Sequence, residues 1–217
     1  MKKPRARHEV QRIRDRAHYD RETAYAILDA GFLAHTGFVV DGQPFVIPML
    51  YARREDALLL HGSIASRLIN RLGEGVEACV SMTLIDGLVL ARSHFHHSAN
   101  YRSVVAFGRA TLVADAQQKA DALAHFVDAM LPGRAAESRP PDKNELAATA
   151  VLHFSIVDIS AKIRGGGPKD DKADMELPHW SGVVPAALRY GAPVPADDCA
   201  CEVPTSVRRL LASEAQA

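Results

Sequence analysis

Apolar and polar residues alternate with a period of two along much of the chain, which is the pattern of half-buried β-strands. The clearest run extends from Val76 to Leu84, where every second side chain is apolar. Six or seven such runs follow one another without a regular βαβ rhythm, which favours an antiparallel barrel or sandwich over a doubly wound sheet. The predicted strands cover residues 32–40, 43–52, 57–62, 76–84, 88–95, 101–113 and 151–164.

Turn and cap residues separate these runs. Asp-Gly at 41–42, between two β-rich segments, predicts a tight hairpin, and Asp-Gly at 86–87 predicts a second turn. Asp20 and Asp115 are good N-caps for two amphipathic helices, and an apolar stripe at helical spacing predicts a third helix over 64–72. The sequence therefore predicts a mainly β fold with a few short flanking helices.

Composition narrows the classes of partner. The chain of 217 residues carries 26 Lys and Arg against 26 Asp and Glu, so no net field draws it to nucleic acid or to an anionic membrane. The first 21 residues form a basic arm, for which a solvated lead-in is the simplest interpretation. No apolar run approaches membrane-spanning length and no apolar signal core is present, so neither export nor insertion is indicated.

The cysteines argue for a reducing compartment. Three of them are too few for a disulfide framework, and Cys199 and Cys201 are spaced C-x-C without a second Cys/His pair that would complete a zinc site. We therefore expect a cytoplasmic protein without a bound metal ion. Residues 169–217 are rich in Pro, Ala and charge, which predicts a core domain over 1–168 and a C-terminal extension that packs on it or on a partner.

One segment suggests an anion site. The predicted strand that ends at His61 and Gly62 leads directly into a helix start with two serines and Arg67. Unpaired N–H groups, hydroxyl donors and a guanidinium together suit a phosphate. The alternative is an ordinary N-cap followed by a solvated helix charge. A second polar cluster at 97–104 could donate to the same anion, or be a turn with a solvent-facing arginine.

Other candidates are ambiguous. His94, His96 and His97 could share a metal ion, but no further ligand completes the set, which favours loop histidines. Trp180, the single tryptophan, is either a packing anchor or a platform for a flat ring. The chain has no nucleophile elbow, Walker loop, G-x-G-x-x-G or H-E-x-x-H motif.

These signals occur in a familiar order. The stretches FVIPMLY, LLLHGSIASRL, DGLVLARSHFHHSANYRSVVAFGRA and HWSGVVP together resemble the pyridoxamine 5′-phosphate oxidase-like flavin-binding proteins, in particular the branch that includes nitroimidazole-resistance proteins. The resemblance implies a six-stranded antiparallel split β-barrel that forms a homodimer, with flavin mononucleotide (FMN) at the subunit interface. It places these residues at the cofactor: Pro48, Met49, Leu50, Tyr51, His61, Gly62, Ser63, Ser66, Arg67, Asn100, Tyr101, Arg102, Ser103 and Trp180.

The resemblance also implies a function. It indicates a flavin-dependent oxidoreductase that acts on a small organic molecule, while the tail lacks the arginine-rich segment of true vitamin B6 oxidases. No residue is assigned as acid or base; Tyr51, His61 and His97 are candidates for tuning a ring by hydrogen bonds. The alternatives are a flavin store or sensor, a haem binder that uses His94, His96 or His97 as axial ligand, and a dimer module without cofactor.

Overall fold

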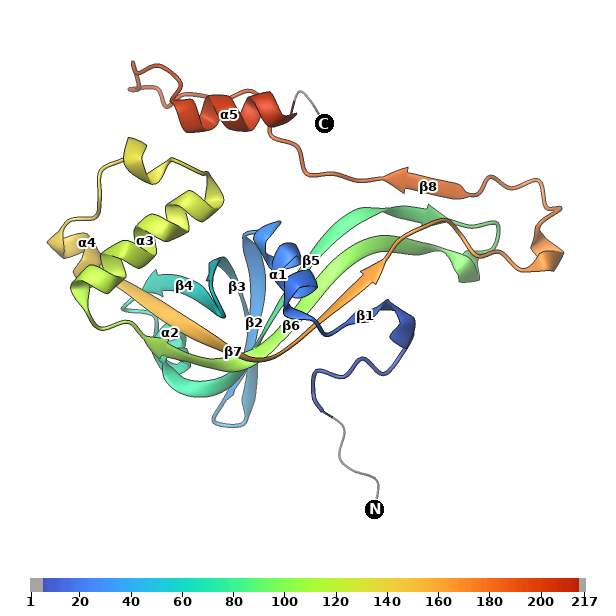
Figure 1. Ribbon diagram of the computed structural model, residues 1–217, viewed down its shortest axis with the longest axis horizontal. Helices are drawn as coiled ribbons and strands as arrows, with labels where there is room; N and C mark the ends of the chain where they lie inside the picture. The colour runs from blue at the N-terminus through green and yellow to red at the C-terminus, as the bar shows by residue number, and fades with distance from the viewer. Residues whose placement is uncertain (1–5, 215–217) are drawn as a thin grey trace. The chain divides into compact units, whose positions relative to one another are not determined.

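The computed structural model describes residues 6–214, without the side chains of Leu68 and Glu214, and shows a mainly β protein (Figure 1). The strands are β1 (Ala17–His18), β2 (Leu33–Val40), β3 (Gln43–Arg54), β4 (Ala57–Ser63), β5 (Glu74–Leu90), β6 (Ser98–Leu112), β7 (Thr149–Arg164) and β8 (Gly182–Pro185). The helices are α1 (Arg21–Asp29), α2 (Arg67–Gly73), α3 (Ala116–Met130), α4 (Lys143–Ala148) and α5 (Thr205–Glu214). Single turns of 3₁₀ helix are η1 (Arg14–Arg16), η2 (His94–His96), η3 (Ala135–Glu137) and η4 (Lys172–Asp174).

The sheet confirms the predicted fold class and corrects the strand count. Its strand order is β1-β7-β4-β3-β2-β5-β6, and β6 also pairs with β7, so six strands form a closed path. The sheet has eight strands rather than six, because the short β1 pairs with β7 and the short β8 pairs with β5. Neither short strand has enough residues for an alternating pattern, so the sequence did not reveal them.

Contacts divide the chain into two compact units. Unit 1 comprises Met1–Pro48, Glu77–Gly108 and Ile156–Ala187, and unit 2 comprises Met49–Val76, Arg109–Ser155 and Leu188–Ala217. Because β5 and β7 are 17 and 16 residues long, each contributes residues to both units. The division predicted at residue 168 concerns a core domain and its extension, and it stays a prediction.

The two Asp-Gly pairs have different roles. Asp41 and Gly42 have φ values of 50° and 78°, as the two central residues of a tight hairpin turn require, and they join β2 to β3 as predicted. The turn predicted at 86–87 is wrong, because β5 runs straight through it. There a Cβ on Gly87 would lie 2.8 Å from the carbonyl oxygen of Val184, so this glycine permits the close approach of β8.

Caps position the helices. Asp20 and Asp115 accept hydrogen bonds from the backbone N–H groups three residues on, at 2.7 and 2.8 Å, which confirms two predicted helix starts. The third helix, α2, begins at Arg67 rather than at Ile64, because Ser66 caps it. The short α4 and the tail helix α5 were not predicted. Among the residues described here, no helix is long and apolar enough to cross a membrane.

Each unit has its own apolar interior. In unit 2, Leu58, Leu59 and Leu60 of β4 are fully buried, and α3 covers one face of the strands through Ala122 and Phe126. Unit 1 buries alternate residues of β5 and β6, which confirms the period of two seen in the sequence. These are Ala78, Val80, Met82, Val89, Val104 and Ala106. The packed strands hold the exposed loop segments that carry the candidate site.

Candidate cofactor site

The predicted phosphate segment is a closed turn between β4 and α2. The Ile64 N–H donates to the carbonyl of Ala148, and the Ser66 N–H donates back to the carbonyl of Ser63 at 2.9 Å. The Ser63 hydroxyl accepts from the Ala65 N–H at 3.2 Å, and the Ser66 hydroxyl accepts from the Ile69 N–H at 3.4 Å. Each hydroxyl therefore uses a lone pair locally and keeps its hydrogen for a further acceptor, such as a phosphate oxygen.

Arg67 follows this turn as the first residue of α2. Its side chain is exposed, and within residues 6–214 it makes no hydrogen bond or ion pair. On the same helix, Arg71 is instead paired with Glu74 at 2.7 Å. The turn thus presents one uncommitted guanidinium next to two hydroxyl donors, which is a donor set that fits a phosphate group.

His61 and Gly62 precede the turn at the end of β4. The His61 ring is half-buried and meets the Phe126 ring edge-on at 4.4 Å between centroids. Its Nδ1 is buried without a hydrogen-bond partner in residues 6–214, and burial lowers the pKa of the imidazole, which favours the neutral ring. A Cβ on Gly62 would lie 3.1 Å from the Ile69 side chain, so this glycine serves the packing of α2 on β4.

The strand segment from Pro48 to Tyr51 offers little side-chain chemistry. Met49 and Tyr51 are core residues, exposed by only 6% and 1%, and Leu50 packs against the apolar cluster under α3. Pro48 is exposed but has no donor. If this segment faces a flavin ring, as the resemblance implies, the contact involves backbone groups and the exposed Pro48 rather than the two buried side chains.

The predicted residues of β6 lie in unit 1, and their polar groups have partners there. Arg102 holds the carboxylate of Asp86 with both Nε and Nη2, at 3.0 and 2.7 Å, and this hydrogen bonding raises the pKa of the guanidinium. The buried Asn100 accepts from Arg164 through its Oδ1, and the Ser103 hydroxyl donates to the carbonyl of Lys162. Tyr101 is half-buried. Asp86 occupies the Nε–Nη2 edge of Arg102, so a direct contact from Arg102 to an anion would use the hydrogens on Nη1.

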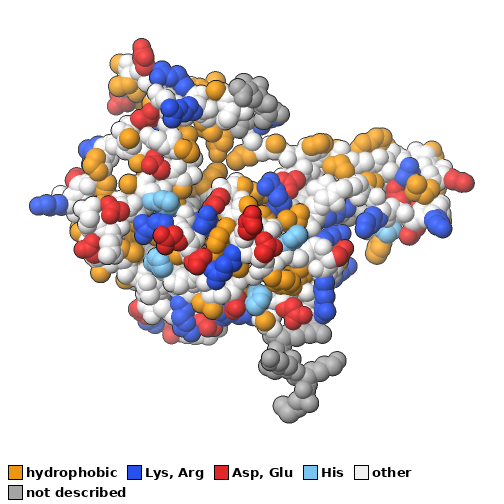
Figure 2. All heavy atoms as spheres, in the orientation of Figure 1, with side chains coloured by type: hydrophobic (Ala, Val, Ile, Leu, Met, Phe, Trp, Pro, Cys, Tyr) orange, Lys and Arg blue, Asp and Glu red, His pale blue; other side chains and the backbone are white. Residues whose placement is uncertain are grey.

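Trp180 lies just before β8, also in unit 1. Its side chain is 65% exposed, and its ring packs on Gly182, where a Cβ would lie 2.9 Å from the ring. The segment is held by Arg92, which binds the carboxylate of Asp170 at 2.7 Å and the Ser181 hydroxyl at 2.8 Å. Figure 2 shows orange side chains along β8. In this strand, the Val184 side chain is 45% exposed. The ring is thus anchored on one side and open on the other.

The histidines of η2 and its flank make distinct contacts. The His97 Nδ1 lies 2.8 Å from the carbonyl of Ser93, and the His96 Nε2 lies 3.2 Å from a carboxylate oxygen of Asp171. A carbonyl only accepts, so the His97 Nδ1 carries a hydrogen, and in the neutral ring the lone pair lies on Nε2. The His94 ring lies edge-on to the His97 ring, with 6.3 Å between the ring centroids. Of these three rings, His97 is the one whose Nδ1 is held by a backbone carbonyl.

The predicted site residues therefore fall into two groups. Unit 2 contains Met49 to Tyr51 and the turn from His61 to Arg67, and unit 1 contains Pro48, Asn100 to Ser103 and Trp180. Within unit 2, β4 and β3 are paired through Tyr51 and Leu60, which brings the first group to neighbouring strands. The assignment of both groups to one cofactor remains a prediction.

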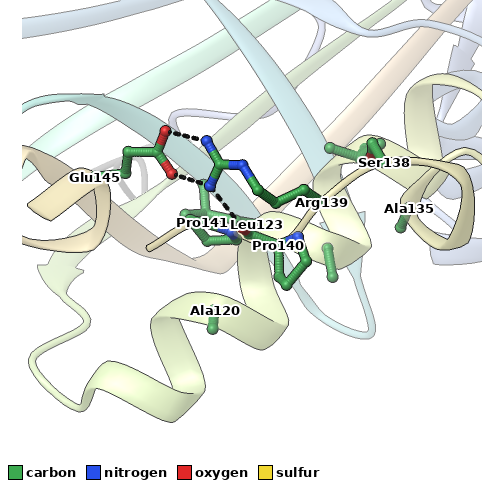
Figure 3. Close-up of a pocket in the computed structure, with 10 residues that line it drawn as sticks. Ala120, Leu123, Ala135, Ser138, Arg139, Pro140, Pro141 and Glu145 are labelled. Carbon is green, nitrogen blue, oxygen red and sulfur yellow. Dashed lines mark hydrogen bonds and ion pairs between the residues drawn. The ribbon is translucent and has the colours of Figure 1, made fainter. Parts of the chain in front are cut away.

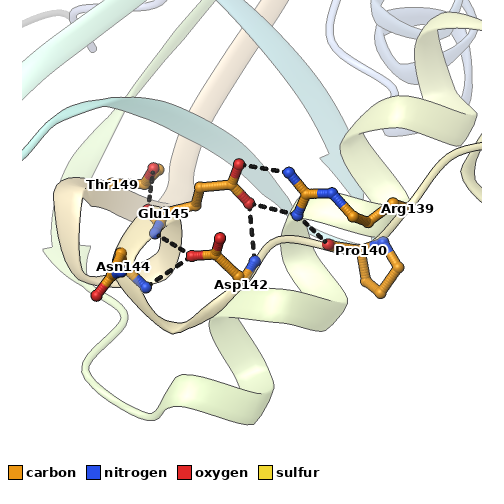
Figure 4. Close-up of polar contacts among 6 residues, drawn as sticks. All are labelled: Arg139, Pro140, Asp142, Asn144, Glu145 and Thr149. Atoms are coloured by element: carbon orange, nitrogen blue, oxygen red, sulfur yellow. Dashed lines mark hydrogen bonds and ion pairs between the residues drawn. The ribbon is translucent and has the colours of Figure 1, made fainter.

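A cavity that the sequence did not predict lies between α3, η3 and α4. It has a volume of about 490 Å³ and a largely apolar wall (Figure 3). Arg139 and Glu145 form a two-pronged ion pair at its edge, at 2.7 and 2.8 Å, and Glu145 also accepts from the N–H of Asp142 (Figure 4). The Asp142–Glu145 spacing is a capping box, a signal for α4 that was present in the sequence. Because Arg139 and Glu145 neutralise each other, the cavity combines a largely apolar wall with no net charge.

This ion pair predicts an acid-dependent contribution to stability. The hydrogen bond from Arg139, followed by that from Asp142, lowers the pKa of Glu145 from 4.5 to about 2. A lowered folded-state pKa stabilises the fold above the unfolded value and loses that effect as the pH falls from 4.5 towards 2. We expect wild type to be more stable than Glu145→Gln at pH 6, with the difference vanishing near pH 2 and shrinking in high salt. Urea unfolding at several pH values measures it, and a pH-independent difference would contradict it.

Comparison with known proteins identifies the family. Residues 20–163 match the family described as pyridoxamine 5′-phosphate oxidase. The chain belongs to this family. The predicted resemblance is thus confirmed, and no curated protein sequence matches the chain.

Two solved structures are similar over nearly the whole length of this family member. The flavocytochrome Anf3 from Azotobacter vinelandii is 40% identical, with 94% of this chain and 96% of that chain covered and a TM-score of 0.87. The FAD and haem binding protein from Mycobacterium smegmatis is 39% identical, with 90% and 97% covered and a TM-score of 0.86. A candidate 5-nitroimidazole antibiotic resistance protein from Bacteroides thetaiotaomicron, at 18% identity and a TM-score of 0.56, covers 68% of this chain and shares the fold.

Proposed function

We propose that the protein binds a flavin nucleotide and a haem and works as an oxidoreductase on a small organic molecule. The observation that carries the flavin half is the turn after β4, where Ser63 and Ser66 keep free hydroxyl hydrogens and Arg67 has no partner within the described chain. The two relatives of about 40% identity support it, since one is named a flavocytochrome and the other a FAD and haem binding protein.

The flavin form is part of this proposal. The resemblance implied FMN, whereas the relative from Mycobacterium smegmatis is named for FAD. We therefore propose FAD, with FMN as the alternative outcome. Both carry a phosphate on the ribityl chain, so the same turn serves either molecule. A bound flavin supplies hydride and single-electron transfer, and a haem supplies single-electron transfer.

The haem half rests on His97. A haem iron needs only one or two protein ligands, so the lack of a cluster of three metal-binding side chains in residues 6–214 does not bear on it. The chain has no C-x-x-C-H motif for covalent attachment. The His97 Nδ1 is fixed by the Ser93 carbonyl, which orients the ring and leaves Nε2 as the ligand atom.

The protein's own groups bind and orient rather than react. Tyr51 is buried in the core, and the pKa of His61 is lowered by burial, so His61 can act as a neutral hydrogen-bond partner for a ring. A homodimer and a cytoplasmic location belong to the same proposal. Exposed Val39 and Val46 on the β2–β3 hairpin, beside the stacked rings of Phe38 and Phe45, support a partner surface, and the three cysteines are free.

A visible absorption spectrum of the purified protein tests the proposal. We expect the two bands of an oxidised flavin together with a haem Soret band, and chromatography of the released cofactors identifies the flavin as FAD or FMN. A spectrum with flavin bands but no Soret band would support flavin binding and contradict haem binding. A colourless protein that takes up neither added flavin nucleotide nor added hemin would contradict the proposal and favour a module without cofactor.

A further inference from the structure

Arg164, at the end of β7, is a buried cation that has no acidic partner within residues 6–214. Its side chain is only 7% exposed. Its guanidinium donates to the Asn100 amide oxygen and to the carbonyls of Gly166 and Gly167, at 3.2 and 3.4 Å for the two glycines. All three acceptors are neutral. Burial of a charge is costly unless an opposite charge compensates it, so this arrangement is incomplete as it stands.

The unused hydrogens of Arg164 are arranged to hold an oxyanion. A guanidinium has five N–H groups, and three of them are used here, which leaves the Nε–H and one on Nη2. The Nε is buried and has no hydrogen-bond partner among the residues that the structure describes. Because the two terminal nitrogens each reach a carbonyl of the glycine loop, the remaining pair lies on the opposite, Nε–Nη2 edge. Arg102 uses this same edge to hold the Asp86 carboxylate.

A second cation lies close by. Arg16 directly precedes β1, and β1 pairs with β7 through Ala17 and Lys162, two residues before Arg164. Burial, and then the charge of Arg16, lower the pKa of Arg164, while Tyr101 raises it, and no carboxylate of the described residues acts on it. Arg16 is half-buried and has no ion pair in the described residues. Two like charges held together in this way favour a shared anion.

We propose that Arg164 and Arg16 form a binding site for an oxyanion, namely a carboxylate or phosphate group carried by a small molecule. The loop Gly165–Gly167 covers the guanidinium and is exposed, and a Cβ on any of its glycines would meet nothing within 4 Å. Gly166 has a φ of 95°, a conformation that favours glycine. In this site, Arg16 of the basic N-terminal arm helps to bind the anion.

The anion has two sources with the same chemistry. It is either a free metabolite, or a phosphate or propionate group of a bound cofactor; the second source rests on the proposed function. Inorganic phosphate serves as the probe for the first source, and the cofactor content of the purified protein reports the second. A protein that proves colourless leaves the phosphate measurement fully applicable, so failure of the proposed function is distinguishable from failure of this site.

Calorimetric titration with inorganic phosphate, at constant ionic strength, compares wild type with Arg16→Gln and with Arg14→Gln, each also in an Arg67→Ala background so that the turn after β4 does not contribute. Arg14 is a matched control, because it lies in the same turn, is exposed and has its own weak ion pair with Glu9 at 3.9 Å. Arg164→Lys keeps the charge but loses the two-pronged edge. We expect about tenfold weaker phosphate binding in Arg16→Gln and in Arg164→Lys, and no change in Arg14→Gln.

If a cofactor supplies the anion, the loaded protein does not bind phosphate, and Arg16→Gln retains less cofactor than Arg14→Gln. Either pattern supports the site. Phosphate affinity and cofactor content that are both the same in wild type, Arg16→Gln and Arg14→Gln would overturn it. Arg16→Gln keeps the proposal testable even if Arg164→Lys fails to fold, because Arg16 is only half-buried.

Discussion

Arg67→Ala is expected to weaken flavin nucleotide binding by tenfold to more than a hundredfold. A charge-assisted hydrogen bond to phosphate is worth about 1.5–3 kcal/mol, which corresponds to that range. Because Arg67 is exposed and has no partner within the described chain, its removal takes no contact from the fold, and the free energy of unfolding should change by less than about 0.5 kcal/mol. Titration of the cofactor-free protein with FMN and FAD measures the effect.

Two comparisons separate the phosphate contact from general damage. Riboflavin lacks the phosphate, so its weak binding should be the same in wild type and in Arg67→Ala. Arg71→Ala removes the same charge from the same helix but from a residue already paired with Glu74, and we expect flavin affinity close to wild type. Arg67→Lys should recover part of the loss, since the charge remains while the planar fork is lost. Equal FMN affinities in wild type and Arg67→Ala would remove the basis for the site.

His97→Ala should lower the haem content at least tenfold. Loss of a residue that merely supports a ligand typically costs ten- to a hundredfold in metal affinity, so loss of the ligand itself should cost no less. The reason for choosing His97 is its tautomer, since Nδ1–H donates to the Ser93 carbonyl and Nε2 keeps its lone pair. The measurement is the ratio of Soret to protein absorbance after reconstitution with hemin.

His96→Ala is the matched control for this prediction. It removes a histidine from the same turn whose Nε2 faces the Asp171 carboxylate, and we expect it to keep most of the haem. Flavin content should be unchanged in both variants if the two cofactors bind independently. Loss of haem in His94→Ala or His96→Ala with retention in His97→Ala would reassign the ligand. Retention in all three would place the axial ligand outside this turn.

Local signals in the sequence were sufficient for much of the fold. Asp41-Gly42 predicted its hairpin because a two-residue turn demands positive φ at both positions, and Asp20 and Asp115 predicted their helices because a cap bonds only to its own first turn. Gly87 misled because a glycine that forms a turn and one that permits close approach of another strand have the same local pattern. Only the position of β8, almost a hundred residues later, distinguishes them.

The candidate site was less accessible to prediction. The turn after β4 is contiguous, so its donors could be recognised together. The ion pair of Arg102 with Asp86 and the bond of Arg164 to Asn100, 64 residues away, were not predicted, while the role of Arg102 at a cofactor stays a prediction. Such pairs depend on strand register and on side-chain direction, neither of which a single sequence specifies. The cavity between α3, η3 and α4 was not predicted either, because it also depends on how separate elements pack.

The hydrogen bonds of Arg92 to Asp170 and Ser181 allow the segment between these two residues to vary in length. The guanidinium of Arg92 binds both Asp170 and Ser181, and the backbone N–H of Arg92 also donates to Asp170. Both ends of segment 171–180 are therefore fixed, while nearly all of the segment is exposed. Lengthening a loop whose ends are already held costs little, about 0.6 kcal/mol for a doubling. This segment is therefore a suitable place to insert a peptide tag without shifting β8 against β5.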